Sequence, residues 1–550
     1  MSDRVTRSEW RWAAVVALVV VAFSTVPYIA GHLAQTPDLR FAGAVYDLED
    51  YHSYLARMWQ GYRGSWRFQL LFTPQPHEGV YIQPFHVLLG HLARLAGLGL
   101  PLTYQVARVG LGFLMLLTVY RFIARFTPAG GARRAAFLLA ATASGLGWLV
   151  EVICPTPAGG ISPIDFWLID AYVFFSLFIV PHFSAAIALL LSLYDLLLRQ
   201  VGAAGQSAPQ PPLWRDILLA VLLSWGLGLV HPYTLLLADL VPALYLAGDA
   251  VARRRLPWRP LILLAAMGAA QAPLLLYEYQ LFATSPIFQS WAAQNLTLSP
   301  PPLHYLLGYG LVALLALWGV RSALRATRRA SFLLIWLAAV AVLAYLPWGL
   351  QRRFLEGVHV ALCILAGYGL AEGLMPALAH PLGRAARVLR YNARRLRWLV
   401  QAALLALTML SNLYLVMTYT AAAATRHPAL FHPAGEVAAL EWLNGHSAWD
   451  ATLLAAYETG NWAAGAIGRR VVVGHWAETV NCEAKEARVA SFYAAATPDA
   501  ERRALLEQWN VQYVYLGPHE RALGNFDPAA APYLEAVFQN DDAAIYRVVE

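Results

Sequence analysis

Long apolar stretches recur along this chain and restrict its fold more than any other feature. Each has close to the 20 residues that an α-helix needs to cross the hydrocarbon core of a bilayer. The stretches lie at residues 11–33, 101–120, 135–153, 171–198, 214–230, 233–252, 260–278, 303–320, 331–349, 354–375 and 398–419. Since 59% of the 550 residues are hydrophobic and only 13% are charged, the chain has too little polar surface for a water-soluble globule of its size. We therefore predict an α-helical polytopic membrane protein with about 11 transmembrane helices.

The arginines between these stretches predict the orientation of the helices. If the N-terminus is cytoplasmic, the expected outer loops 154–170, 231–232 and 279–302 contain neither lysine nor arginine. The expected cytoplasmic loops carry Arg121, Arg125, Arg133 and Arg134; Arg199 and Arg215; Arg253, Arg254, Arg255 and Arg259; Arg321, Arg325, Arg328 and Arg329; and Arg384 through Arg397. This asymmetry follows the positive-inside rule, so the basic residues indicate topology and not a nucleic-acid partner. We expect a multi-pass protein of the bacterial plasma (inner) membrane.

The two longest segments between and after the apolar stretches are expected on the outer side. Residues 34–100 form the first outer loop, and residues 420–550 have the composition of a soluble domain. Short runs in this tail predict strands at 451–456, 470–475, 511–517 and 543–549, and helices at 461–468, 485–495 and 498–509. We therefore predict a transmembrane domain, 1–419, followed by an extracytoplasmic α/β domain, 420–550.

Residues 45–66, in the first outer loop, have the pattern of an amphipathic helix. At 100° per residue the apolar side chains form one stripe, made of Leu48, Tyr51, Leu55, Met58, Trp59 and Tyr62. The opposite face carries Glu49, Asp50, Ser53 and Arg57. This pattern predicts a helix in the membrane interface whose polar face is directed toward water or a cavity. A solvated charged face without function is the alternative interpretation of the segment taken alone.

The position of this acidic helix, directly after the first apolar stretch, resembles the GT-C superfamily of membrane glycosyltransferases. The superfamily includes protein O-mannosyltransferases, oligosaccharyltransferases and the lipid A aminoarabinose transferases. Residues 79–98 (GVYIQPFHVLLGHLARLAGL) resemble the second juxtamembrane helix of their first loop, and residues 103–113 (TYQVARVGLGF) resemble the start of their second span. The many spans and the α/β tail agree with this resemblance, which implies a GT-C-like fold.

The resemblance also implies a catalytic carboxylate at the head of the first-loop helix. In these enzymes it is the general base that takes a proton from the acceptor hydroxyl, while a phosphate-linked sugar already carries a good leaving group. Both Glu49 and Asp50 match this position; we favour Asp50, and Asp47 is close by in sequence. Tyr54, one turn later, is expected near Asp50, and Arg57 lies on the same polar face.

Further candidates lie in the other outer loops. The resemblance implies that Asp165 or Asp170 could bind a divalent metal or substrate; a helix N-terminal charge that faces water is an equally good explanation. The pair Arg352 and Arg353 departs from the positive-inside pattern. Guanidinium groups suit bidentate binding of phosphate, although a membrane anchor or a salt-bridged pair would have the same sequence.

Histidines and tail residues complete the set of candidates. His182 lies within the fourth apolar stretch, and His359 follows the arginine pair by about two turns; each is a candidate for substrate contact, with local packing as the alternative. In the tail, Glu458, His475 and Glu478 follow predicted strands and are weaker candidates for acceptor contact. Ordinary loop polarity is the simpler explanation for these three.

These observations predict a glycosyltransferase that moves a sugar from a polyprenyl-phosphate-linked donor to a protein, lipid or glycan acceptor, with inversion at the anomeric carbon. No cofactor is indicated by a motif, and a divalent metal stays open. The alternative function is a transporter or flippase of a lipid-linked substrate. Transporters place ionisable residues near the bilayer midplane in two related halves, whereas here these residues gather at the expected outer interface and no repeat is visible.

Overall fold

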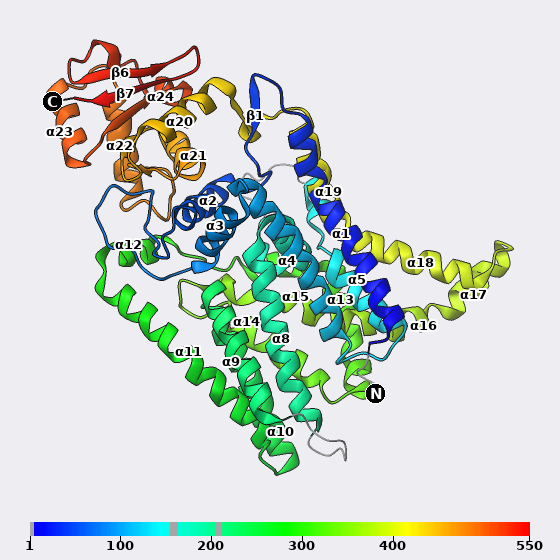
Figure 1. Ribbon diagram of the computed structural model, residues 1–550. Coiled ribbons are helices and arrows are strands. Elements are labelled where there is room, and N and C mark those ends of the chain that lie inside the picture. The colour runs from blue at the N-terminus through cyan, green and yellow to red at the C-terminus, as the bar shows by residue number, and fades with distance from the viewer. Residues whose placement is uncertain (1–4, 154–162, 204–211, 550) are drawn as a thin grey trace. The chain divides into compact units, whose positions relative to one another are not determined.

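Contacts divide this largely helical chain into two compact units (Figure 1). The structure is a computed structural model that describes residues 5–153, 163–203 and 212–549, so the expected outer-loop residues 154–162 lie outside the described residues. The helical unit comprises Met1–Thr25, Ala107–Leu276 and Thr297–Thr418. The α/β unit comprises Val26–Val106, Tyr277–Leu296 and Tyr419–Glu550. Residues 34–100, the predicted first outer loop, therefore belong to the same compact unit as the C-terminal tail.

Every predicted span coincides with one helix or with a run of consecutive helices. Among the described residues, eight segments are long and apolar enough to cross a membrane, and two bent pairs raise this number to ten. The eight are α1 (Arg7–Leu33), α4 (Leu100–Ile123), Pro181–Val201 of α8 (Pro181–Ala203), α9 (Leu213–Val230), α10 (Thr234–Arg253), α11 (Trp258–Thr284), α13 (Pro302–Ala326) and Gln351–Ala377, which includes α15 (Val358–Tyr368) and α16 (Met375–Ala377). At the predicted span 331–349, α14 (Ala330–Leu343) is apolar but shorter. The prediction of a polytopic helical membrane protein is confirmed.

Two of the spans consist of bent helix pairs. Residues at the bend of one pair form hydrogen bonds with residues at the bend of the other. The pairs are α5 (Gly131–Thr142) with α6 (Gly147–Ile153), bent by 51°, and α18 (Ala393–Thr408) with α19 (Leu410–Ala424), bent by 56°. The backbone N–H of Ser144 donates to the carbonyl of Thr408 at 2.6 Å, and the Asn412 side-chain amide donates to the carbonyl of Thr142 at 3.0 Å. Non-helical backbone within a membrane needs such partners because lipid offers none.

The predicted span 171–198 also consists of two helices. α7 (Val173–Ile179) is followed by Val180 in an extended conformation, and α8 begins at Pro181. Proline suits the first turn of a helix because it has no N–H group that would need an acceptor there. His182 therefore lies in the first turn of α8 and not inside one continuous helix.

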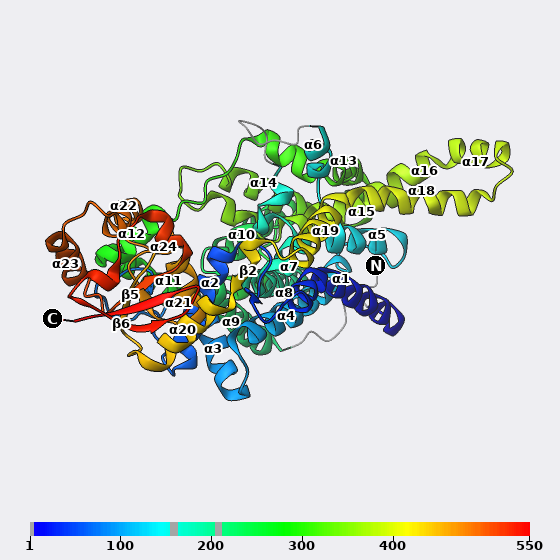
Figure 2. The same ribbon diagram turned by 90° about the horizontal axis from the view of Figure 1, so that it is seen from above.

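The most basic of the expected cytoplasmic segments forms a helical hairpin. α17 (Ala379–Val388) lies beside α18 in both views (Figures 1 and 2). The side chain of Asn392 begins α18, since its Oδ1 accepts the N–H groups of Arg394 at 2.9 Å and Arg395 at 3.1 Å. The short turn between the helices keeps the arginines of this segment at the surface.

The C-terminal tail folds around a five-stranded mixed sheet with strand order β4-β3-β5-β7-β6. The strands are β3 (Thr452–Leu454), β4 (Arg470–Val471), β5 (Tyr513–Leu516), β6 (Leu534–Gln539) and β7 (Ala544–Val548). The helices around it are α20 (Ala434–His446), α21 (Tyr457–Ile467), α22 (Cys482–Tyr493), α23 (Asp499–Gln508) and α24 (Pro518–Leu523). β3 pairs in parallel with β4 and β5, whereas β7 pairs antiparallel with β5 and β6. The predicted α/β fold of the tail is confirmed; β6 was not among the predicted strands.

The first outer loop packs into this unit through a β-ribbon and two helices. β1 (Leu39–Phe41) pairs antiparallel with β2 (Phe431–Pro433), which joins the start of the loop to the tail. α2 (Leu48–Tyr62) packs against α3 (Pro84–Ala96) and against α21. The α2–α3 crossing is so close that a Cβ at Gly90 would lie 1.9 Å from the carbonyl oxygen of Met58. Only glycine fits there.

The environment of α2 corrects the sequence prediction for this helix. The sequence predicts a helix in the membrane interface with its polar face toward water or a cavity, but residues from both faces are buried, including Ser53 and Arg57 of the polar face and Tyr51, Leu55 and Met58 of the apolar stripe. The polar face is covered by the loop after β4. Its charged side chains therefore have protein partners instead of water.

Candidate functional site

Three acidic residues surround the start of α2 in the α/β unit. Glu49 and Asp50 belong to its first turn. Asp47 precedes the helix with a φ of 49°, a left-handed conformation that Asp tolerates better than most non-glycine residues. The N-terminal end of a helix carries partial positive charge, which stabilises carboxylates placed there.

Asp50 combines two hydrogen bonds with access to solvent. Its Oδ2 accepts from the Tyr54 hydroxyl at 3.2 Å, and its Oδ1 accepts from Nε2 of His475 at 3.1 Å. The expected proximity of Tyr54 is thus observed. The Asp50 side chain is nevertheless 37% exposed. A carboxylate that is held in one orientation and still open to a ligand has the geometry that a general base needs.

The loop after β4 fixes the orientation of His475. Its Nδ1 accepts the backbone N–H groups of Ala477 at 3.2 Å and Glu478 at 3.3 Å, which assigns the hydrogen to Nε2, the atom facing Asp50. Burial opposes a charge on this imidazole, but the hydrogen bond to Asp50 and the negative charges of Glu478, Asp50 and Glu49 outweigh it and raise the pKa of His475.

A buried ion pair between Arg57 and Glu478 joins α2 to the loop after β4. The Arg57 guanidinium donates to Glu478 and to the side-chain carbonyl of Gln83, and Ser53 donates to Glu478 at 2.7 Å. Burial alone would raise the pKa of Glu478, but Arg57, His475 and Ser53 more than compensate and lower it. Glu478 is therefore charged and binds α2 to the loop that carries His475.

Glu49 and Asp47 have environments that differ from that of Asp50. Glu49 accepts hydrogen bonds from the Tyr457 hydroxyl and from the backbone N–H of Trp476, so this carboxylate links α2 to the tail. The Asp47 side chain is exposed, next to the charges of Asp50 and Glu49. Loss of hydration and the negative charges of Asp50 and Glu49 raise the pKa of Asp47 to about 7.

The predicted arginine pair lies in the helical unit, in a short 3-10 helix, Gln351–Leu355. Arg353 donates to Asp170 at 3.2 Å, and its guanidinium also lies near the rings of Phe183 and Tyr233. The guanidinium of Arg352 lies 5.3 Å from the centroid of the Trp167 ring. The structure therefore brings together Asp170 and the arginine pair, three of the predicted residues.

Asp165, in contrast, forms hydrogen bonds with the backbone. Its Oδ2 accepts the backbone N–H groups of Gly145 at 2.9 Å and Gly147 at 3.0 Å, at the break between α5 and α6. The carboxylate is buried, so the expectation of a helix N-terminal charge that faces water is wrong for this residue. Asp165 satisfies N–H groups that the bent helix leaves without intrahelical acceptors.

The two predicted histidines belong to different buried clusters of the helical unit. The ring of His182 lies 5.3 Å from that of His231, whose Nδ1 is 2.7 Å from an Oε2 of the buried Glu356. His359 packs beside Tyr172 with ring centroids 5.2 Å apart. Its Nε2 lies 3.4 Å from the sulfur of Cys363, one turn later.

Comparison with known proteins supports one fold. No protein-family model matches the chain, and no curated protein sequence matches it significantly. ArnT from Cupriavidus metallidurans bound to undecaprenyl phosphate has a TM-score of 0.53 and 16% identity, over 96% of this chain and 98% of ArnT. The oligosaccharyltransferase AglB from Archaeoglobus fulgidus, in complex with an inhibitory peptide and a dolichol-phosphate, has a TM-score of 0.50 and 13% identity, over 93% of this chain and 70% of AglB. The arabinofuranosyltransferase AftD from Mycobacteria has a TM-score of 0.56 and 15% identity, over 99% of this chain and 40% of AftD.

The chain has the GT-C fold. At such low identities the likeness concerns the fold alone. The candidate site residues must therefore be judged from their own geometry within the GT-C fold.

Sequence reasoning ranked part of the candidate site too low. His475 and Glu478 appeared as ordinary loop polarity, yet they bind Asp50 and Arg57 across separations of 425 and 421 residues. The only signal was their position directly after a predicted strand. Glu458, the third weak candidate, is exposed on α21. No group of three His, Cys, Asp or Glu side chains within residues 5–153, 163–203 and 212–549 is arranged to hold a metal ion.

Proposed function

We propose that this protein is a membrane glycosyltransferase that moves a sugar from a polyprenyl-phosphate-linked donor to an acceptor hydroxyl, with Asp50 as general base. The observation that carries this proposal is the exposed Asp50 carboxylate, held at the start of α2 by Tyr54 and His475. The GT-C fold supports it, because structures of that fold have been obtained with undecaprenyl phosphate and with a dolichol-phosphate.

The reaction needs one proton transfer and one displacement. The acceptor oxygen attacks the anomeric carbon while its proton passes to the carboxylate of Asp50. The bond between that carbon and the phosphate oxygen breaks, and its electron pair stays on the phosphate. The products are the glycosylated acceptor and polyprenyl phosphate. Attack from the face opposite the leaving phosphate inverts the anomeric configuration.

Asp50 suits the role of base better than Glu49 does. A base must reach its substrate, and the Asp50 side chain keeps over a third of its surface accessible. Glu49 already accepts from Tyr457 and from the backbone of Trp476. Its removal would loosen the contact between α2 and the tail, whereas removal of the Asp50 charge would leave that contact in place.

We assign the phosphate contact to Arg352 and Arg353. Guanidinium groups bind phosphate oxygens in pairs and stay charged at every physiological pH. Asp170 fixes the orientation of Arg353 through an ion pair, and the guanidinium keeps 20% of its surface accessible. His182 and His359 would then pack around the donor site instead of taking part in proton transfer.

The proposal includes the placement of the chain in the cell. We assign residues 1–419 to a transmembrane domain of the bacterial plasma membrane and residues 420–550 to the outer side, on the strength of the arginine asymmetry. A fluorescent reporter that is bright only in the cytoplasm, fused after Glu550, should stay dark. A bright fusion would reverse the topology and move Asp50 to the cytoplasmic side.

The decisive experiment compares Asp50→Asn with Glu49→Gln. Purified protein is supplied with undecaprenyl-phosphate-linked radiolabelled sugars and an envelope extract as acceptor, and binding of undecaprenyl phosphate is measured in parallel. Asp50→Asn should lower transfer about 10²- to 10⁴-fold with little change in lipid binding, because it removes only the proton acceptor. Full transfer by Asp50→Asn would exclude Asp50 as the base. A parent protein that transfers no sugar but moves the lipid across the bilayer of reconstituted vesicles would favour a flippase instead.

A further inference from the structure

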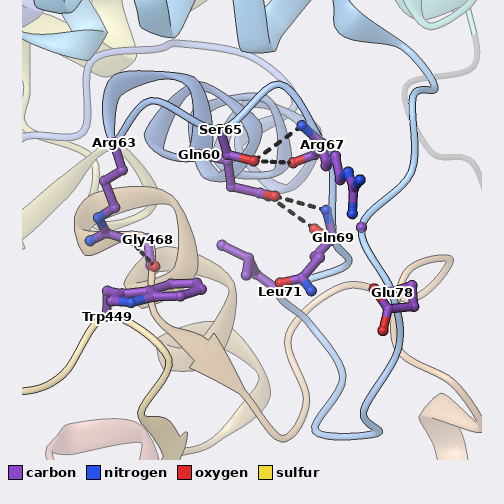
Figure 3. A pocket seen from close by; sticks show the side chains of 10 residues that line it. Gln60, Arg63, Ser65, Arg67, Gln69, Leu71, Glu78, Trp449 and Gly468 are labelled. Carbon is purple, nitrogen blue, oxygen red and sulfur yellow. Dashed lines mark hydrogen bonds between the residues drawn. The ribbon is translucent and has the colours of Figure 1, made fainter.

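A pocket of about 530 Å³ opens in the α/β unit, at the far end of α2 from Asp50 (Figure 3). It is lined by Gln60, Arg63, Ser65, Arg67, Gln69, Leu71, Glu78, Gly79, Trp449 and Gly468. The residues come from the end of α2, the segment that follows it, the loop before β3 and the turn after α21. Its volume is within the range of small-molecule sites in proteins.

Hydrogen bonds fix the walls of this pocket before any ligand arrives. The Gln60 side chain donates to the carbonyl of Gln69 at 2.9 Å and accepts the Gln69 backbone N–H at 2.7 Å. Ser65 and Arg67 are joined by two further bonds, of 2.9 and 3.1 Å. Figure 3 shows both pairs along one wall. A ligand bound here would therefore order few protein groups, which favours affinity.

The charged groups of the pocket are balanced or already engaged. Arg63 donates to the carbonyls of Gly468 at 2.7 Å and Ile467 at 2.8 Å, at the end of α21. Arg67 donates to the Tyr81 hydroxyl and is also stabilised by the negative charge of Glu78, which lies on the same side of the pocket (Figure 3). A phosphate or an acidic ligand would find no cation here that lacks a counter-charge or an acceptor. The pocket instead offers adjacent donors and acceptors, which suit neutral hydroxyl groups.

An exposed tryptophan provides the apolar surface. Trp449 is 60% exposed, and its indole lies along the wall next to Gly468 (Figure 3). Leu71 lies between it and the polar wall in the same view. Indole rings bind ligands that combine an apolar face with a polar edge. The ring of a hexose or pentose has this combination, because its C–H groups form a face and its hydroxyls point outward.

We infer that this pocket binds a neutral oligosaccharide, with one sugar stacked on Trp449 and its hydroxyls bonded by Arg67, Glu78 and Gln69. Assigning that oligosaccharide to the acceptor rests on the function proposed above. Gln60 and Arg63 follow Asp50 by ten and thirteen residues of α2, which corresponds to roughly 15–20 Å along the helix. An acceptor of several sugar units spans that length, so the pocket would hold the chain while its end is at Asp50.

The test is calorimetric titration of the full chain in a detergent that has no sugar headgroup. The probes are cellohexaose, xylohexaose, mannohexaose, arabinohexaose and, as an acidic counterpart, the galacturonate hexamer. At least one neutral hexamer should bind, and Trp449→Ala should weaken its binding about tenfold or more. The matched control is Trp66→Ala, because Trp66 is also exposed but stacks on His91 and does not line the pocket. It should bind like the parent protein.

Other results would overturn the inference. The inference is wrong if no neutral hexamer binds, if Trp449→Ala leaves the binding unchanged, or if the acidic hexamer alone binds. Asp50→Asn separates this inference from the proposed function. If Asp50→Asn binds the hexamer normally and transfers sugar at the full rate, the base assignment fails and the saccharide site stands. If it loses transfer but Trp449→Ala affects neither binding nor transfer, the site fails and the base assignment stands.

Discussion

Each unit contains a carboxylate paired with a basic side chain, but the more exposed partner is the acid in the α/β unit and the base in the helical unit. In the α/β unit, the buried pair of Arg57 and Glu478 supports a loop, and the carboxylate of Asp50 above it is 37% exposed. In the helical unit the carboxylate of Asp170 is 4% exposed, while its partner Arg353 keeps 20% of its surface. The accessible charge is thus negative in one unit and positive in the other. This difference is the reason for proposing a base in the α/β unit and an anion contact in the helical unit.

The largest effect is expected at Glu478, whose replacement tests the buried ion pair of the α/β unit. Glu478→Gln removes the counter-charge of the buried Arg57 guanidinium, and an uncompensated buried charge costs about 3–5 kcal/mol. Thermal unfolding in detergent, followed by tryptophan fluorescence, should show a large loss of stability of the α/β unit. Glu458→Gln is the matched control, because Glu458 lies exposed on α21 and should change stability by less than about 0.5 kcal/mol.

A double replacement separates charge from packing at the same place. With Arg57→Met and Glu478→Met together, no charge stays buried, and apolar pairs of similar volume are often as stable as the ion pair they replace. Most of the lost stability should return. If the double variant is as unstable as Glu478→Gln, the pair acts through its hydrogen bonds to Ser53 and Gln83, and the charge argument is wrong.

The two units also differ in how much of their secondary structure the sequence predicted. The apolar stretches predicted the helices because span length depends on local composition alone, and β3, β4, β5 and β7 were predicted for the same reason. β6 (Leu534–Gln539) escaped prediction because a shift of its pairing register between Ala536 and Phe538 breaks the alternation of its side chains. The breaks between α5 and α6 and between α18 and α19 escaped it because partners from distant segments satisfy them.

The candidate site was predicted only in its local part. The acids at the start of α2 and the position of Tyr54 follow from helical spacing. The polar face of α2 was expected toward water or a cavity, but its Ser53 and Arg57 are buried against protein, and a polar stripe has the same sequence in both cases. Ser53 and Arg57 find that partner in Glu478, more than 420 residues later. Periodicity within one helix carries no information about such a distant contact.

A smaller effect is expected at Arg353, in the helical unit. Arg353→Ala should weaken binding of undecaprenyl phosphate by about 1.5–3 kcal/mol, the range for a hydrogen bond to a charged group. Asp170→Asn provides the control, since it keeps the guanidinium and removes its counter-charge. Lipid binding should then hold or tighten. If Asp170→Asn weakens binding as much as Arg353→Ala does, the pair serves only to hold the fold of the helical unit.

The smallest expected effect concerns Asp47 and is visible only as a dependence on pH. Its pKa rises from 3.8 to about 7, because of lost hydration and the charges of Asp50 and Glu49, so the folded chain binds this proton more tightly than the unfolded chain does. The resulting stability is fully present below the ordinary pKa of 3.8 and is lost as the pH rises to about 7. Because Asp47 is exposed, solvent screening should limit the effect to at most about 1 kcal/mol. Asp47→Asn should therefore unfold at a higher temperature than the parent at about pH 8 and at nearly the same temperature at about pH 3.5, whereas Asp38→Asn, an exposed neighbour in the same loop, should change neither. Equal changes in the unfolding temperature of Asp47→Asn at both pH values would show that Asp50 and Glu49 do not destabilise the Asp47 charge. The acids at the start of α2 would then titrate independently, and Asp50 would have to be described as an isolated carboxylate instead of one member of a charged cluster.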